Sequence, residues 1–268
     1  MPRLCIALLL AALAATVPAV RADVWDQGTD NDNDSGSDTE LTHGLSQVHD
    51  LAAQAGGTVA DEDWYRFQIP YATSWEILLD GLTGDVSGGA ATPALELLDS
   101  DGTTVIGVGS PLTSFSVARH LTTSNLSQTP DYPLYLRVSN PTCGLACTGA
   151  DEYRIRAYET TLFVPRYNNA NSQLTVLVLQ NNSGDLINGF VYAYGASGVF
   201  TGGFSITLAA YEVATFNLAT VSGGVLNNTA GGLRIAHRAG YGQLTGKAVA
   251  LEPATGFTFD TAVIQRPH

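Results

Sequence analysis

The chain has 268 residues, of which 25 are acidic and 12 are Lys or Arg, so its formal net charge is −13. A chain this acidic is not expected to coat nucleic acid or anionic lipid, because both partners are themselves negatively charged. Charged residues make up 14% of the chain and hydrophobic residues 45%, which is the composition of a globular protein.

The first 22 residues have the layout of a secretory signal peptide. A basic start at Met1-Pro2-Arg3 precedes an apolar run over 4–20, and the small-x-small exit Val20-Arg21-Ala22 predicts cleavage after Ala22. No later stretch approaches the roughly 18 apolar residues of a membrane-spanning helix, so no transmembrane anchor is expected. We therefore expect a secreted protein, extracellular or periplasmic, with a mature chain of residues 23–268.

Residues 23–42 form an acidic leader, and no side chain between 30 and 40 is apolar. Such a segment cannot bury enough surface to fold alone, so a solvated leader is one interpretation. The other interpretation is a calcium loop, because Asp32, Asn33 and Asp34 offer hard oxygen ligands. An EF-hand is excluded, because Ser35 stands where that loop needs glycine.

From 43 to 160, short apolar runs alternate with turn residues. Their side chains change between apolar and polar with a period of two, and the runs end at Gly, Asn, Asp or Pro. This spacing predicts the antiparallel strands of a β-sandwich or jelly roll. The candidate strands are 64–69, 74–79, 94–98, 103–106, 134–138 and 153–158. No segment after Ala22 keeps a helical period over three turns, and 44–54 comes nearest to one.

Cys143 and Cys147 are the only cysteines of the mature chain, and they lie in a turn-rich segment. In an oxidising compartment, such a pair is expected to form a disulfide that closes a small loop. The alternatives are a redox dithiol and a metal site. The spacing differs from the two-residue gap of redox motifs, and two thiols without a nearby His are a poor zinc site.

Composition changes sharply near Thr160-Thr161. Residues 23–160 hold 21 acidic residues and five arginines, a net charge of −16, whereas 161–268 hold four acidic and five basic residues, a net of +1. Eight further strand candidates then follow: 162–166, 173–180, 187–194, 204–208, 213–217, 232–236, 244–251 and 257–264. The expected fold class is therefore all-β, with two antiparallel, jelly-roll-like β-sandwich domains at 43–160 and 161–268.

Four motifs follow one another in the first half: an acidic pair before an aromatic strand at 61–67, a Leu-rich strand ending in a D-x-D-G turn at 95–102, the strand 135–138 and the Tyr strand 153–155. With them, residues from about 30 to 160 resemble the bacterial pre-peptidase C-terminal (PPC) domain. The resemblance implies a non-catalytic jelly-roll sandwich in a secreted bacterial protein.

The resemblance also implies a calcium site. The related collagen-binding domains of secreted collagenases bind calcium with an acidic linker that folds back toward a D-x-D loop. Here Asp61 and Asp63 match that loop, and Asp32, Asn33 and Asp34 are the closest counterparts of the linker acids. The charges also favour bringing the leader and the D-x-D loop together around an ion. Asp61, Glu62 and Asp63 place three negative charges side by side, and one divalent cation would relieve their repulsion. The alternative is that all these acids point into water.

Residues 162–268 resemble a β-rich module at the end of uncharacterised secreted bacterial proteins, through 164–169, 177–181 and 247–260. The match transfers no activity. Arg166 and Tyr167 at a strand end are candidates for ligand contact, with turn and packing roles as the alternative. Trp64 and Trp75 are candidates for stacking on sugar rings, since an alternating strand turns one of Trp64 and Tyr65 outward.

No motif of a hydrolase or nucleotide-binding enzyme stands out. The sequence lacks G-x-S-x-G, H-E-x-x-H and P-loop patterns, and acidic pairs such as Asp99 and Asp101 are typical turn residues. We expect a secreted, non-catalytic bacterial binding or adhesion protein whose partner is an extracellular protein or polysaccharide surface. The alternatives are a carbohydrate-binding accessory protein, a surface protein that self-assembles through sheet edges, and a hydrolase using a carboxylate pair.

Overall fold

The computed structural model describes residues 25, 32–37, 39–53, 58–82, 93–109, 114–119, 133–140 and 143–267. The predicted signal peptide lies outside these residues. The all-β prediction is confirmed: the described residues form strands β1–β17, and their helical content is limited to the three-residue 3-10 turns η1 (Gly144–Ala146) and η2 (Val221–Gly223). No described helix has the length and hydropathy that crossing a bilayer requires.

The first half is a sandwich of two four-stranded antiparallel sheets with the strand orders β1-β8-β3-β6 and β2-β7-β4-β5. This alternation of eight strands between two sheets is the jelly-roll arrangement. The strands are β1 (Ser46–Asp50), β2 (Glu62–Gln68), β3 (Thr73–Gly81), β4 (Ala94–Leu98), β5 (Val105–Val108), β6 (Ser114–Arg119), β7 (Pro133–Ser139) and β8 (Glu152–Glu159). The stretch 44–54, nearest to a helical period, thus contains a strand.

The core of this sandwich follows from the period of two. Along β7, buried Leu134, Leu136 and Val138 alternate with half-buried residues, because successive strand residues point to opposite faces. Tyr65 and Phe67 of β2 join the same buried cluster from the neighbouring strand.

The leader runs along β2 rather than into solvent. The Leu41 N–H donates to the Arg66 carbonyl at 3.0 Å, the Arg66 N–H donates to Thr39 at 2.7 Å, and the Trp64 N–H donates to the Asp32 carbonyl at 2.6 Å. Leu41 belongs to the buried core cluster. Backbone pairing and one apolar anchor therefore hold this polar segment against the sandwich.

The second half contains a four-stranded sheet, β13-β10-β15-β16, and a five-stranded sheet, β12-β11-β14-β9-β17. Leucine, isoleucine and valine side chains from both sheets form its own core cluster. The strands are β9 (Leu162–Asn168), β10 (Leu174–Asn181), β11 (Ile187–Gly195), β12 (Phe200–Leu208), β13 (Val213–Asn217), β14 (Ala230–His237), β15 (Leu244–Glu252), β16 (Phe257–Ala262) and β17 (Ile264–Gln265). Each overlaps a strand that the sequence predicted.

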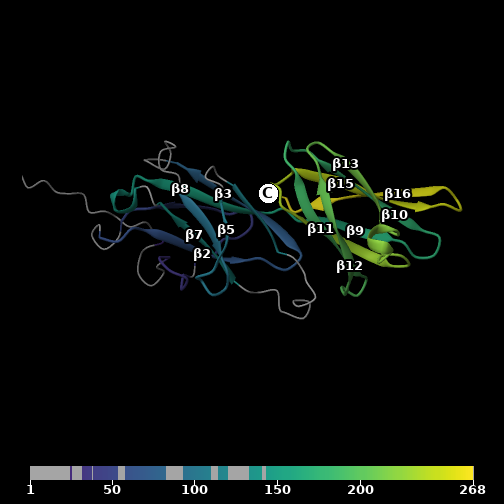
Figure 1. Cartoon of the computed structure of the whole chain (residues 1–268), viewed down its shortest axis with the longest axis horizontal. Helices are drawn as coiled ribbons and strands as arrows, with labels where there is room; N and C mark the ends of the chain where they lie inside the picture. The colour runs from purple at the N-terminus through teal and green to yellow at the C-terminus, as the bar shows by residue number, and fades with distance from the viewer. Residues whose placement is uncertain are drawn as a thin grey trace, which may run out of the picture.

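The two halves meet at Thr160 and Thr161, which are both fully buried. The Ser74 N–H of β3 donates to Thr161 Oγ1 at 2.9 Å, and the Thr160 N–H donates to the Ser74 carbonyl at 2.8 Å. Glu76 of β3 accepts a hydrogen bond from the Tyr241 N–H at 2.9 Å. Figure 1 shows the two groups of sheets on either side of this join, and every sheet draws its strands from one side only.

The predicted disulfide is present. Cys143 and Cys147 are bonded, with their Cα atoms 5.1 Å apart, and they close a loop around η1 just before β8. The Cys147 carbonyl accepts a hydrogen bond from the Ala53 N–H at 3.3 Å. The loop is thereby joined to the segment that follows β1.

Candidate metal centre

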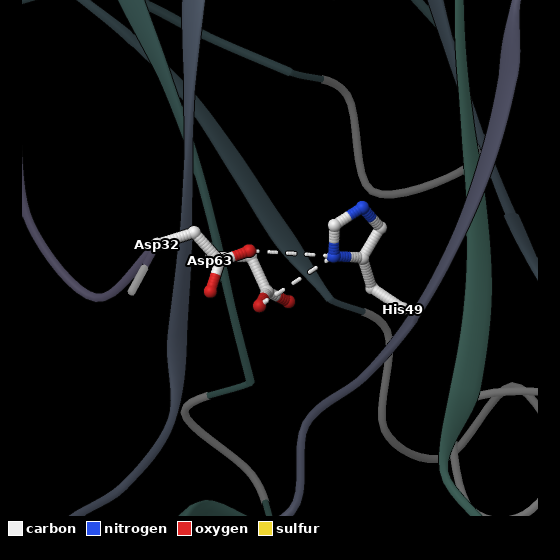
Figure 2. Close-up of side chains that lie close together, drawn as sticks. All are labelled: Asp32, His49 and Asp63. Atoms are coloured by element: carbon white, nitrogen blue, oxygen red, sulfur yellow. Dashed lines mark ion pairs between the residues drawn. The ribbon is translucent and has the colours of Figure 1, made fainter. Parts of the chain in front are cut away.

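Three buried side chains from three separate segments converge inside the first sandwich. Asp32 comes from the leader, His49 from β1 and Asp63 from β2, and one ligand atom from each lies within 4.8 Å of the others (Figure 2). All three side chains are 0% exposed or nearly so. Such a group has the residue types and the spacing to hold a metal ion.

The fold explains why these three side chains meet. β1 pairs with β8 in one sheet, and β2 pairs with β7 in the other, so His49 and Asp63 approach from opposite layers. Asp63 shares the inward face of β2 with Tyr65, two residues on. Asp32 is held beside it because its carbonyl accepts the Trp64 N–H.

The distances between donor atoms suit a small cation. His49 Nδ1 lies 3.4 Å from Asp32 Oδ2 and 3.9 Å from Asp63 Oδ1. Tetrahedral ligands with bonds of about 2.0 Å stand roughly 3.3 Å apart, so the observed separations are slightly open. Both carboxylate oxygens of Asp32 are buried and receive no hydrogen bond from the described residues. A buried carboxylate in this condition is costly unless a cation neutralises it.

The far side of the imidazole is already engaged. His49 Nε2 lies 3.3 Å from Gln47 Oε1, and Gln47 Nε2 donates to the Glu40 carbonyl at 2.9 Å. The second bond fixes the amide so that its oxygen faces His49, and Nε2 must then carry the hydrogen. In a neutral ring, Nδ1 therefore presents its lone pair to the two carboxylates. An outer acceptor that orients a ligating imidazole in this way is typical of metal sites.

Two tyrosines orient the second carboxylate. Tyr153 Oη donates to Asp63 Oδ2 at 2.5 Å, and Tyr65 Oη lies 2.5 Å from Tyr153 Oη. Burial, reinforced by the neighbouring Asp63 charge, raises the pKa of Tyr153 well above 10. The phenol therefore stays protonated and donates to Oδ2, and the opposite oxygen of Asp63, Oδ1, faces His49.

The structure brings together only part of the predicted ligand set. Asp32 and Asp63 join the cluster, whereas Asn33 is half-buried and Asp34 is exposed, accepting the Gly36 N–H at 2.7 Å. Asp61 is buried near β2 but is not a member of the group. The acids of the leader and of the D-x-D segment therefore do not all point into water.

His49 was not among the residues that the sequence singled out. It stands in Ser46-Gln47-Val48-His49-Asp50, where alternation would turn Val48 inward, whereas the structure exposes Val48 and buries His49. Hydrophobic alternation within this strand therefore gave no signal for His49 as a ligand.

Three of the four predicted ligand-contact residues are corrected by the structure. Trp64, Trp75 and Tyr167 are 6%, 6% and 1% exposed, so they have no ring face to offer a ligand. Trp64 does point to the outer face of β2, but the Arg137 guanidinium covers its ring at 5.4 Å. Trp75 packs edge-on against Phe67 in the core at 5.2 Å. Arg166 is exposed, as ligand contact requires.

Comparisons with known proteins do not assign a family. No family model matches the chain, and no curated protein matches it. Weakly similar solved structures include the extracellular region of zebrafish Gpr126/Adgrg6 (7% identity, TM-score 0.24, 83% of this chain and 30% of that one). A second is a calcium-binding mutant of Bacteroides uniformis beta-glucuronidase 2 (11% identity, TM-score 0.21, 81% of this chain and 27% of that one). A third is a mutant VP2 protein of infectious bursal disease virus (13% identity, TM-score 0.19, 87% of this chain and 76% of that one). The chain thus spans less than a third of the first two.

Proposed function

We propose that the protein is a secreted binding protein in which a divalent cation, held by Asp32, His49 and Asp63, fastens the leader to the first sandwich. The observation that supports this proposal is the meeting of three buried ligand atoms from the leader, β1 and β2. The ion supplies positive charge to two buried carboxylates and adds a link between three segments that hydrogen bonds and core packing already join. Its role is structural, because all three ligands are buried and a substrate has no access to them.

The donor set bears on the identity of the ion. Calcium, the ion expected from the sequence, takes six to eight oxygen ligands, and two aspartates supply at most four. An imidazole nitrogen beside two carboxylates is a donor set typical of zinc and other first-row metals. We propose an ion of the zinc class, with calcium as the alternative that the experiment must separate.

The test is thermal melting of the mature chain, residues 23–268, after chelation and again with added zinc or calcium. An ion that binds only the folded state stabilises it by about 2.7 kcal/mol at one hundred times its Kd. We expect zinc to raise the melting temperature of the chelated protein, and His49→Gln and Asp63→Asn to remove the effect. Asp34→Asn, in the exposed part of the leader, is the matched control and should melt like the wild type.

The outcomes distinguish the proposals. A rise with calcium that survives His49→Gln would replace the zinc-class ion with an oxygen-ligated calcium site. Equal melting temperatures with chelator, zinc and calcium would overturn the metal proposal altogether.

The binding role beyond the metal rests on the sequence. The secretory start, the resemblance to PPC domains and the absence of catalytic motifs in the sequence support a non-catalytic partner of an extracellular protein or polysaccharide surface. Pull-down of the purified mature chain on insoluble polysaccharides and on collagen tests this role. Retention without release of soluble product supports binding, whereas turnover that is lost with a single carboxylate substitution would favour a hydrolase.

A further inference from the structure

Strand β16 forms an exposed edge at the tip of the second half. It is the last strand of the sheet β13-β10-β15-β16, and Figure 1 places its hairpin with β15 at the end of the molecule away from the first half. Phe257 and Phe259 on this strand are 69% and 60% exposed. Two large aromatic side chains on one free edge are an unusual amount of apolar surface to leave in water.

The edge also lacks the features that usually prevent strands from pairing. Exposed edges are commonly protected by lysine, proline, a bulge or an inward-pointing charge. β16 contains no lysine and no proline, and its pairing with β15 is regular over all six residues. Its single charge, Asp260, forms an ion pair with Lys247 of β15 at 2.6 Å.

The hydrogen-bond phase shows which backbone groups face outward. The Val263 N–H donates to the Gly246 carbonyl at 3.2 Å, and Ala262 lies opposite Lys247. Because antiparallel pairs alternate, Phe257, Phe259 and Thr261 bond toward β15, and Thr258, Asp260 and Ala262 direct their N–H and C=O groups to the free edge.

We propose that a second copy of this chain occupies the edge, with β16 pairing antiparallel to β16 about a two-fold axis at Thr258. In this register, Thr258 exchanges both hydrogen bonds with Thr258 of the second copy. Phe257 of each copy then lies opposite Phe259 of the other copy, which gives two such pairs. Both pairs occupy non-hydrogen-bonded positions, where side chains approach most closely. The contact uses the same surface on both copies, as a closed dimer requires.

The distribution of charge favours a two-fold axis at Thr258 and a contact through the β16 tip. An axis at Asp260 would place two carboxylates directly opposite each other, whereas the axis at Thr258 places Asp260 opposite Gly256. Residues 161–268 carry a net charge of +1, and the −16 of residues 23–160 lies in the other half. Pairing at this tip therefore keeps the two acidic halves apart. The dimer does not depend on the metal site, so either proposal can fail alone.

Sedimentation velocity of the mature chain over a range of concentrations tests the dimer. We expect a concentration-dependent dimer for the wild type and a monomer for Thr258→Pro. Proline removes only an outward N–H, and edge strands tolerate it there. Thr258→Val keeps the N–H and is the matched control, so it should still dimerise. Phe257 and Phe259 also line a hollow of about 290 Å³ with Arg166 and Glu252. A protein that is monomeric at every concentration would overturn the proposal and leave this hollow as a candidate small-ligand site.

A crosslink tests the register independently of how well the proline variant folds. Hydrogen-bonded antiparallel partners have Cα atoms about 5.5 Å apart, within the range of a disulfide. Oxidation should therefore convert Thr258→Cys to a covalent dimer. In Asp260→Cys, the two sulfur-bearing residues would lie about 13 Å apart along the strands and should not crosslink. Equal crosslinking of both variants, or of neither, would overturn the register.

Discussion

His237 is a buried histidine at the join between the two halves. It lies at the end of β14, and its Nε2 is 2.8 Å from the Thr160 carbonyl. Because a carbonyl only accepts, Nε2 carries the hydrogen of the ring. Burial lowers the pKa of His237 to about 4, although the hydrogen bond to Thr160 opposes the shift. The folded protein therefore keeps this ring neutral well below neutral pH.

This shift predicts a loss of stability on acidification. Below pH 6.5 the unfolded chain gains a proton at His237, whereas the folded chain does not until about pH 4. The free energy of unfolding should therefore fall as the pH drops from 6.5 to 4, by about 3 kcal/mol in total from this residue. Urea unfolding at several pH values measures the slope. In His237→Gln, the fall in the free energy of unfolding over this window should be smaller by about 3 kcal/mol, and an unchanged fall would contradict the assignment.

At the scale of strands, the sequence predicted much of the fold. Alternation in segments such as 134–138 depends only on neighbouring residues, so most strands of both halves could be placed within a few positions, whereas β1 and β6 were not predicted. The convergence of Asp32 with Asp63 was expected from charge crowding and from the resemblance to PPC domains. What alternation could not show is which outward residue another strand covers. Trp64 is buried because Arg137 on β7 lies over it, and that contact depends on the register between β2 and β7.

The role of His49 was missed for a similar reason. Its partners are 17 and 14 positions away along the chain, and they meet it only after the two sheets stack and the leader folds back. No local pattern encodes such a meeting. A buried histidine on an alternating strand indicates that a partner must exist but does not say which residue provides it.

The disulfide loop gives a prediction at this scale. The ring between Cys143 and Cys147 is short, so it removes little freedom from the unfolded chain, and its loss should cost about 2 kcal/mol. Urea unfolding of the Cys143→Ser, Cys147→Ser double variant under the same oxidising conditions measures this difference. A cost near zero would mean that the loop contacts, including Ala53 to Cys147, hold the segment without the bond.

The net charge of the molecule is unevenly distributed, at −16 for residues 23–160 and +1 for residues 161–268. Salt has two opposing effects on the first half. It screens repulsion among the acids, and it weakens surface ion pairs such as that between Arg154 and Asp80. Exposed pairs contribute only about 0–1 kcal/mol each, so relief of repulsion should dominate.

We therefore expect the melting temperature to rise between low salt and about 0.5 M NaCl, where the screening length falls below 10 Å. Differential scanning calorimetry with chelator present, to exclude divalent ions, makes the measurement. A melting temperature that falls with salt would show that ion pairs outweigh the crowding of acids.

The join at Thr160 and Thr161 has a mechanical consequence. Both residues are buried, and Ser74, Glu76 and His237 fasten their surroundings from either side. These contacts restrict rotation of the two halves relative to each other. A force applied to one half should therefore be transmitted directly to the other half through these contacts.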